Sequence, residues 1–534
     1  MATLEAVRVK NLRCLSDTES VSLRPITLFV GRNSAGKSTF ARLLPLLRQS
    51  AEEEKRSPIL WYGRLVDFGN FETAVNKFSD QRKIEFSFKI KVPKDSAPSA
   101  YYYPFMLDRM GAVFFAEETE IGATICLVQS EKSKSCYASS VLIEIFGNKL
   151  EIVFSGSQKL DEIRVNRLVW QAAEANQVVC RVSQGRIFPR LKFFRQYSRK
   201  SEGVEKKFLR QVDPFDGYLR ESLYESLAHR RTSSEKIDRL MSFIPIGSDE
   251  SIIESLSQLP FSTKAFKRKV VDLNSLSSEF MRLRDSLYLR HLPQLLDLVD
   301  SSLNEILSGV RYLEPLRATA QRYYRIQELA IDELDSKGAN VAMFIDSLSE
   351  LELERLNAWL NEYFSVRLRP RNEGGHVAIE LLKTDSKSGM NLADLGFGFS
   401  QLLPIIIQLW HSSQPNYLKG RRGMASASSI VVIEQPELHL HPAYQANIAD
   451  VFVAAIKNAR AANRSITVLA ETHSPHLVNR MGQLIEQGVF GREDVQVILF
   501  DESEDGDRSV VKVSYFDNKG VLLDWPFGFF EPDY

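Results

Sequence analysis

The spacing of apolar residues changes along the chain, and each change predicts a different kind of structure. Near the N-terminus, the apolar run Ile26–Val30 predicts a buried strand, and the helical spacing of Phe40–Leu47 predicts a helix. In the last third, predicted helices and strands alternate over residues 402–411, 429–433, 443–461, 466–470, 474–481 and 495–500. Such alternation is typical of a parallel sheet with helices on its faces.

The middle of the chain has two other patterns. Apolar and polar residues alternate one by one over 82–90, 121–128 and 141–154, which predicts half-buried strands, and Gly147-Asn148 supplies a hairpin turn. From about residue 160 to residue 370 the apolar spacing is mostly helical, so helices and few strands are expected there.

The loop between Ile26–Val30 and Phe40–Leu47 carries the clearest motif. Gly31–Thr39 fits G-x-x-x-x-G-K-[ST] at every defined position. In this motif the glycines let backbone N–H groups surround phosphate oxygens, the lysine attracts the β- and γ-phosphates, and the hydroxyl ligates Mg²⁺. We therefore expect ATP and Mg²⁺ as cofactors, with nucleotide contacts from Gly31, Asn33, Ser34, Ala35, Gly36, Lys37, Ser38 and Thr39.

An acidic residue follows a predicted central strand in the last third. Ser429–Ile433 is a continuous apolar run, and Glu434 comes directly after it. In such NTPases, a carboxylate that helps to hold Mg²⁺ stands at the carboxyl end of a strand beside the phosphate loop. Ser38 and Glu434 are therefore the predicted Mg²⁺ ligands.

The two halves of this predicted site lie at opposite ends of the sequence. The expected fold is thus α/β, a P-loop nucleotide-binding domain split by a β-rich lobe and a large helical insertion. We expect the first part of the ATPase domain over 1–80, the β-rich lobe over 81–160, the helical insertion over 161–375, and the rest of the ATPase domain over 376–534.

Composition excludes some functions and leaves others open. The 534 residues carry a formal net charge of zero, so nucleic-acid binding would need a local basic patch. The four cysteines show no C-x-x-C spacing, so neither a zinc site nor a disulfide framework is indicated. A cytoplasmic location is expected, because the N-terminus lacks a signal-peptide core and the apolar stretch Leu402–Trp410 is too short to span a bilayer.

Two polar clusters allow more than one interpretation. Residues 181–210 mix aromatic side chains with ten basic ones, and they fit either nucleic-acid binding or a solvated helix face whose aromatic residues are core. The basic residues are Arg181, Arg186, Arg190, Lys192, Arg195, Arg199, Lys200, Lys206, Lys207 and Arg210. The other cluster consists of His439, His441, His473 and His476. These histidines could bind a metal, although a structural turn is the better interpretation.

The motifs together resemble ABC-type ATPases of the RecF/SMC/OLD branch. Gly31–Thr39 matches the Walker A motif, and Ile430–Glu437 matches the Walker B strand. His473 matches the switch histidine that senses the γ-phosphate, and Leu395–Gln401 takes the place of the signature loop. The resemblance implies an ABC-type domain that dimerises around ATP. In such a dimer the signature loop of one subunit, with Gly398, Ser400 and Gln401, would contact the nucleotide held by the other.

A narrower resemblance is to the ATPase subunits, called PtuA, of the Septu and retron-associated anti-phage systems. It rests on Tyr62–Gly69, on Glu434–Pro442 and on the chain end Gly520–Phe530. It implies a regulatory ATPase in an antiviral complex, with an HNH nuclease as partner. In the retron version, a reverse transcriptase and its RNA–DNA product would hold the complex inactive.

OLD nucleases carry an acidic Toprim domain after the ATPase, but too few residues follow His473 for one, so no intrinsic nuclease is expected. The acidic run Asp501–Asp507 is interpreted as a solvated loop.

One departure from the ABC pattern bears on the chemistry. The residue after the Walker B acid is usually a carboxylate that orients the attacking water, and here it is Gln435. An amide can position water but is a poor proton acceptor. Glu437 is the candidate substitute, so the predicted catalytic residues are Glu434, Gln435, Glu437 and His473. Slow hydrolysis follows as a hypothesis. The alternatives are a RecF-like DNA-repair ATPase that binds DNA directly, or a non-hydrolysing scaffold that holds ATP.

Overall fold

Two compact units make up the chain. The structure is a computed structural model that describes residues 2–94, 115, 118–156, 159–172, 178–201, 204–228, 232–259, 264–326, 333–383, 388–414, 428–503 and 509–524. The first unit comprises Met1–Asn11, Ser50–Trp61 and Phe68–Glu305. The second unit comprises Leu12–Gln49, Tyr62–Asp67 and Ile306–Tyr534. Each unit is described separately below.

The first unit is built on an antiparallel sheet in the order β10-β9-β8-β7-β6-β5-β1. Its strands are β1 (Thr3–Leu12), β5 (Lys83–Val92), β6 (Thr119–Gln129), β7 (Cys136–Ile145), β8 (Asn148–Gly156), β9 (Lys159–Val165) and β10 (Leu168–Gln171). Every second residue of β5 is buried, as the alternation predicted. Phe146 and Gly147 have φ of 48° and 74° in the hairpin between β7 and β8, which suits a tight turn. The strands predicted over 82–154 are confirmed.

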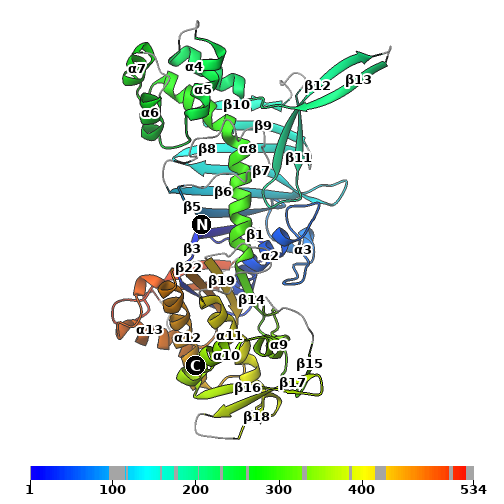
Figure 1. Cartoon of the computed structure of the whole chain (residues 1–534), viewed down its shortest axis with the longest axis vertical. Coiled ribbons are helices and arrows are strands. Elements are labelled where there is room, and N and C mark those ends of the chain that lie inside the picture. Colours follow the sequence, from blue (N-terminus) through cyan, green and yellow to red (C-terminus); the bar gives the residue numbers. More distant parts are fainter. Residues whose placement is uncertain are drawn as a thin grey trace. The chain divides into compact units, whose positions relative to one another are not determined.

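A smaller antiparallel sheet and several helices complete the first unit. The sheet contains β11 (Val178–Ser183), β12 (Arg190–Ser201) and β13 (Val204–Gln211). Figure 1 shows β12 and β13 extending together as a two-stranded ribbon. The helices are α3 (Phe71–Ala74), α4 (Asp216–Ser226), α5 (Ser234–Phe243), α6 (Asp249–Gln258), α7 (Lys264–Val271) and the long α8 (Ser278–Ser308). Figure 1 shows α8 lying across the strands of the larger sheet.

These strands correct the prediction for the range 161–375. The elements β9 to β13 occupy residues 159–211, where helices were expected from residue 161 onward, and helices begin only at Asp216. The interpretation of 181–210 as a solvated helix face is wrong for the same reason. The misleading feature is the pair Phe193-Phe194, because two adjacent aromatic residues break the period of two by which a strand is recognised.

The second unit contains the predicted parallel sheet, in the order β14-β19-β20-β4-β21-β22. Its strands are β4 (Ile26–Gly31), β14 (Val310–Leu313), β19 (Ser428–Glu434), β20 (Ser465–Glu471), β21 (Val495–Glu502) and β22 (Ser509–Ser514). All neighbouring pairs are parallel except β21 and β22. Strand β4, from the start of the sequence, lies between β20 and β21, from its end. The predicted α/β P-loop fold, with its sheet split between the two ends of the chain, is therefore confirmed.

Helices and a second small sheet complete this unit. The helices are α1 (Lys37–Ala41), α2 (Leu43–Glu52), α9 (Val341–Asp346), α10 (Glu350–Phe364), α11 (Phe397–Ser413), α12 (Pro442–Ala461) and α13 (Pro475–Glu486). The small sheet contains β15 (Tyr324–Arg325), β16 (Val366–Glu373), β17 (His376–Lys383) and β18 (Met390–Asn391). The short strands β2 (Leu15–Asp17) and β3 (Val21–Ser22) belong instead to the sheet that contains β1. None of the helices among the described residues is long and apolar enough to cross a membrane.

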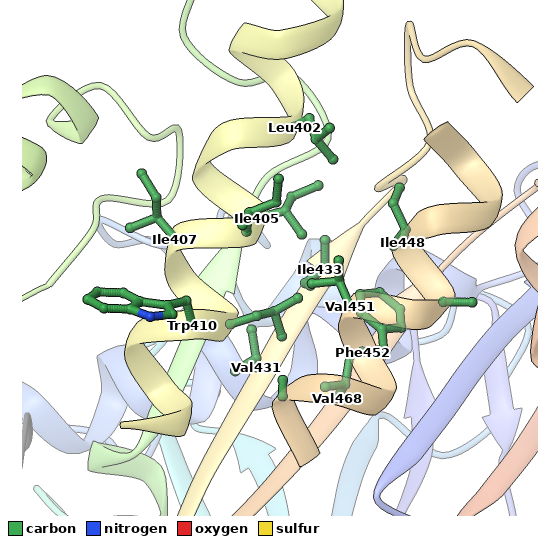
Figure 2. Packing of buried hydrophobic residues seen from close by; sticks show 14 of the residues in the cluster. Leu402, Ile405, Ile407, Trp410, Val431, Ile433, Ile448, Val451, Phe452 and Val468 are labelled. Carbon is green, nitrogen blue, oxygen red and sulfur yellow. The ribbon is translucent and has the colours of Figure 1, made fainter. Parts of the chain in front are cut away.

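A single apolar cluster fixes the central strands of the parallel sheet. Figure 2 shows Val431 and Ile433 of β19 near Phe452 of α12, and Trp410 of α11 belongs to the same cluster. All four side chains are buried. Strand β19 is buried along nearly its whole length, as a central parallel strand with helices on both faces requires. This packing holds the carboxyl ends of β19 and β20 in fixed positions beside the loop that follows β4.

Candidate nucleotide-binding site

The loop between β4 and α1 has a backbone that requires glycine at two positions. Gly31 has a φ of 154° and Gly36 has a φ of 102°. A Cβ atom at Gly31 would lie 2.0 Å from the carbonyl oxygen of Phe500, and one at Gly36 would lie 2.6 Å from Cδ2 of Leu15. Packing as well as conformation therefore explains both glycines of the motif.

Gly31→Ala is expected to lower the free energy of unfolding by about 3 kcal/mol, because the new methyl group meets backbone in the neighbouring strand β21. The measurement is urea unfolding of the purified protein. Gly488→Ala is the matched control, since Gly488 also has a positive φ of 67° but has open space around its Cβ position. An equal loss in both variants would contradict the role assigned to close packing.

Lys37 is the first residue of α1, and its side chain is buried. Its Nζ atom donates hydrogen bonds to the carbonyl oxygens of Gly31, at 2.9 Å, and of Arg32, at 2.6 Å. Burial lowers the pKa of Lys37, and the charge of Glu471 partly opposes this. The ammonium group is thus held by the loop itself, where phosphate oxygens would replace the two carbonyls. Of the other predicted loop residues, Asn33 and Ser34 are exposed, whereas Ala35 and Thr39 are buried.

The hydroxyl of Ser38 faces a carboxylate to which the motifs assigned no role. Its Oγ donates a hydrogen bond of 2.9 Å to Oε1 of Glu471, the last residue of β20. The other oxygen, Oε2, is buried and has no hydrogen-bond partner among the described residues. Burial, reinforced by the charge of Glu434, raises the pKa of Glu471 to about 7. The sequence shows that Glu471 follows an apolar strand in the same way as Glu434, but the placement of β20 next to β4, which brings Glu471 to Ser38, is visible only in the structure.

Glu434 ends β19 directly opposite Glu471, but its carboxylate is occupied. Arg42 donates from Nε to Oε1 and from Nη2 to Oε2, both at 2.7 Å. The hydroxyl of Tyr312 donates to Oε1 at 2.6 Å. The hydrogen bond to Glu434 raises the pKa of Arg42 above its ordinary value. The arginine thus largely balances the charge of Glu434.

The donor set beside Ser38 fits Mg²⁺. This ion prefers hard oxygen ligands and is usually bound through one or two carboxylates together with substrate phosphates. Ser38 supplies a hydroxyl, and Glu471 supplies a buried carboxylate with one unpartnered oxygen. Glu434, the ligand predicted from the sequence, is one strand away but is bonded to Arg42. Glu471 is therefore the better placed of the two carboxylates for a cation held by Ser38.

Glu437 holds the segment that follows β20. Its Oε1 accepts a 2.6 Å hydrogen bond from the backbone N–H of His473, and its Oε2 accepts a 2.9 Å hydrogen bond from the hydroxyl of Thr472. Burial raises the pKa of Glu437. Burial, reinforced by the positive charge of Lys37, lowers the pKa of His473, the predicted switch histidine. The backbone N–H of Gln435 donates to the carbonyl oxygen of Glu471 at 2.8 Å, so the two strand ends are tied together.

A buried arginine connects the predicted signature segment to the end of β19. In α11, Gln401 accepts a 3.0 Å hydrogen bond from the backbone N–H of Arg317 and donates one of 2.9 Å to its carbonyl oxygen. Arg317 in turn donates from Nη2 to the backbone oxygen of Glu434 at 2.8 Å. Burial lowers the pKa of Arg317 to about 10. The amide of Gln401 is thus used within the chain, and Ser400 is buried while Gly398 is half-buried. Their contact with a second subunit's nucleotide stays a prediction.

Of the four clustered histidines, His441 has a structural role. Nδ1 of His441 accepts a 3.3 Å hydrogen bond from the backbone N–H of Ala443 and so caps α12. Across the described ranges, no three His, Cys, Asp or Glu side chains come together in a way that could hold a metal ion. Part of the chain-end motif, from Trp525 to Phe530, and the acidic residues Glu504, Asp505 and Asp507 lie outside the described residues.

Comparisons with known proteins identify ATPase domains in two parts of the chain. Residues 3–166 match the family described as "AAA ATPase domain". Residues 245–479 match the family described as "AAA domain, putative AbiEii toxin, Type IV TA system". No protein with a curated description matches the chain. Two parts of the chain are thus similar to AAA-type ATPase domains, which agrees with the coarse part of the sequence interpretation.

Among solved structures, the chain is similar to SMC head domains. One is the Smc head domain of Pyrococcus furiosus with an extended coiled coil, bound to the C-terminal domain of ScpA, at 8% identity over 96% of both chains with a TM-score of 0.34. Another is the SMC head domain of Thermotoga maritima, at 7% identity over 95% of this chain and 98% of that chain with a TM-score of 0.30. At TM-scores this low, the likeness supports no inference about function.

Proposed function

We propose that the chain is an Mg²⁺-dependent ATPase that regulates a partner nuclease in bacterial anti-phage defence. The observation that supports the ATPase part is the contact between Ser38 and Glu471 beside the buried Lys37. Glu471 ends β20, and Lys37 and Ser38 begin the helix after the loop that follows the neighbouring parallel strand β4. Open α/β sheets bind ligands at this edge, outside the carboxyl ends of the strands. The chain therefore has the cation, the hydroxyl and the carboxylate that a nucleoside triphosphate with its metal needs in one place.

Each residue of this site has a separate task in the proposal. Ser38 and Glu471 would hold Mg²⁺, which when bound neutralises charge on the phosphate oxygens. Lys37 binds the β- and γ-phosphates, and His473 senses the γ-phosphate. Glu437 fixes the backbone of His473 and so acts as a positioning residue. Gln435 orients the attacking water with its amide but is a poor proton acceptor, so turnover is slow.

The regulatory part rests on the resemblance to Septu and retron ATPase subunits. The family matched by residues 245–479 is itself described as a toxin of a toxin–antitoxin system, which agrees with a role in defence. The proposed partners are a second copy of the chain, bound through shared ATP, and an HNH nuclease. In the retron version, a reverse transcriptase with its RNA–DNA product joins the complex. The proposed location is the cytoplasm.

Lys37→Ala is expected to weaken ATP binding at least tenfold, because the variant lacks the cation that faces the phosphates. The test measures ATP affinity and turnover of the purified protein, with and without DNA, in wild type and variant. It is repeated with an HNH nuclease from a Septu-type system as the proposed partner, whose DNA cleavage is followed with and without ATP. Turnover that is unaffected by Lys37→Ala would contradict the ATPase proposal, and cleavage that is indifferent to ATP would contradict the regulatory one.

A non-hydrolysing scaffold is the second candidate, and Gln435 favours it. Tight ATP binding that depends on Lys37, without any turnover, would support this reading. A repair ATPase is the third candidate and would instead show strong stimulation of turnover by DNA.

A further inference from the structure

The ribbon formed by β12 and β13 has one face on which a pair of arginines lies next to a pair of aromatic rings. In the antiparallel register Arg195 is opposite Arg210, and Tyr197 is opposite Phe208. Directly opposed residues of an antiparallel pair lie on the same face, as do residues two positions apart on one strand. The register continues with Arg199 opposite Lys206. The aromatic pair therefore lies beside the arginine pair on one face of the ribbon.

This arrangement is unfavourable for the isolated protein. Like charges directly opposite each other on a sheet destabilise it. Tyr197 and Phe208 are 42% and 52% exposed, so their rings contribute little to a core. Arg195 and Arg210 are exposed as well, and no carboxylate among the described residues pairs with either of them. A ligand that neutralises the arginines and covers the rings would remove both the charge repulsion and the exposure of apolar surface.

The base of the ribbon is packed against neighbouring side chains. Two positions before Arg195 on the same strand, Phe193 is buried and meets Trp170 and Phe215 edge to face, with ring centroids 5.9 and 5.1 Å away. On the opposite face, the guanidinium of Arg181 lies 5.0 Å above the ring of Phe194. The ribbon therefore changes from a buried apolar base to an exposed basic and aromatic part within one strand.

We propose that this face of the ribbon binds single-stranded nucleic acid. Phosphates of the backbone would meet the paired arginines, and unpaired bases would stack on Tyr197 and Phe208. Positively charged surfaces with exposed aromatic side chains bind single strands in this way, because every base has a face that can stack. The ribbon lies entirely within the first unit, and the ATP site lies in the second, so this proposal does not depend on the proposed ATPase function.

The test is fluorescence anisotropy with a labelled thirty-nucleotide poly-dT strand and a labelled duplex of equal length, using the full chain. Arg195→Glu/Arg210→Glu is expected to weaken single-strand binding about thirtyfold. If two phosphate contacts are lost, the slope of log K against log salt falls by about 1.4. Tyr197→Ala/Phe208→Ala is expected to weaken binding about tenfold with little change in that slope.

The matched control is Lys267→Glu/Arg268→Glu, which makes the same charge change at exposed positions of α7 in the same unit. Equal weakening in the control and in the arginine variant would overturn the assignment to the ribbon. Duplex binding as tight as single-strand binding, with no effect of the aromatic substitutions, would overturn the stacking of unpaired bases. Lys37→Ala is expected to bind the strand like wild type, which separates this result from any failure at the ATP site.

Discussion

Glu471→Gln is expected to lower ATP turnover about a hundredfold, which corresponds to about 2.7 kcal/mol of transition-state stabilisation. The substitution keeps the size of the side chain and its hydrogen bond with Ser38 but removes the negative charge. A neutral amide cannot replace a carboxylate as a strong Mg²⁺ ligand. The Mg²⁺ concentration needed for half-maximal binding of a non-hydrolysable ATP analogue should rise at least tenfold, and this measurement does not depend on turnover.

The control for this prediction is Glu502→Gln. Glu502 ends β21 as Glu471 ends β20, but it is exposed, so the same charge is removed outside the proposed metal site. Wild-type turnover and an unchanged Mg²⁺ requirement are expected for the control. The same unchanged values for Glu471→Gln would show that Glu471 is not a metal ligand and would return that role to Glu434.

The same substitution at Glu434 is expected to have a different effect, because the two glutamates that end the adjacent strands β19 and β20 have separate roles. The carboxylate of Glu434 accepts hydrogen bonds from Arg42, which follows α1, and from Tyr312 of β14, so it ties both to the end of β19. Removing one partner from a buried ion pair leaves the other charge uncompensated. Glu434→Gln should therefore reduce stability as well as activity. Glu471→Gln should leave stability nearly unchanged, because the carboxylate of Glu471 is buried without an arginine or lysine bonded to it among the described residues.

Local patterns in the sequence predicted the parts of the site that belong to one loop or one strand. The phosphate loop is recognisable because Gly31, Lys37 and Ser38 have fixed spacing, and the structure shows that packing also enforces the glycine. The strands β19 and β20 are recognisable because both faces are buried and their residues are therefore uniformly apolar. In each case the physical cause acts over a few neighbouring residues, so the sequence displays it directly.

The missed features depend on contacts between residues far apart in sequence. The pairing of Arg42 with Glu434 joins positions 392 residues apart, and nothing near either residue indicates it. The role suggested for Glu471 depends on strand order, because only the placement of β20 next to β4 brings it to Ser38. The ribbon was missed for another reason. Its exposed part has little to bury, so the apolar alternation that marks a strand stops after Phe193.

Gln435→Glu is expected to raise ATP turnover about a hundredfold. Gln435 follows Glu434 directly, and its backbone is fixed by the hydrogen bond to Glu471 and by a φ of 44°. Glutamate has the same length and tolerates the same backbone, so the substitution changes the chemistry of the side chain and little else. A carboxylate can accept the proton of the attacking water, and general-base catalysis typically contributes about 10²- to 10⁴-fold. The lower end is expected here, because Glu434, Glu437 and Glu471 already place negative charge nearby.

The measurement for Gln435→Glu is single-turnover ATP hydrolysis, which separates the chemical step from product release. Gln487→Glu adds the same charge at an exposed position after α13 and should leave the rate unchanged. A Gln435→Glu variant no faster than wild type would mean that this side chain does not reach the attacking water. Glu437 would not then be the simple replacement, because its two oxygens already hold Thr472 and the backbone of His473. A faster variant would instead show that the wild-type site is built to retain ATP, and that the amide at position 435 sets how long the nucleotide-bound state lasts.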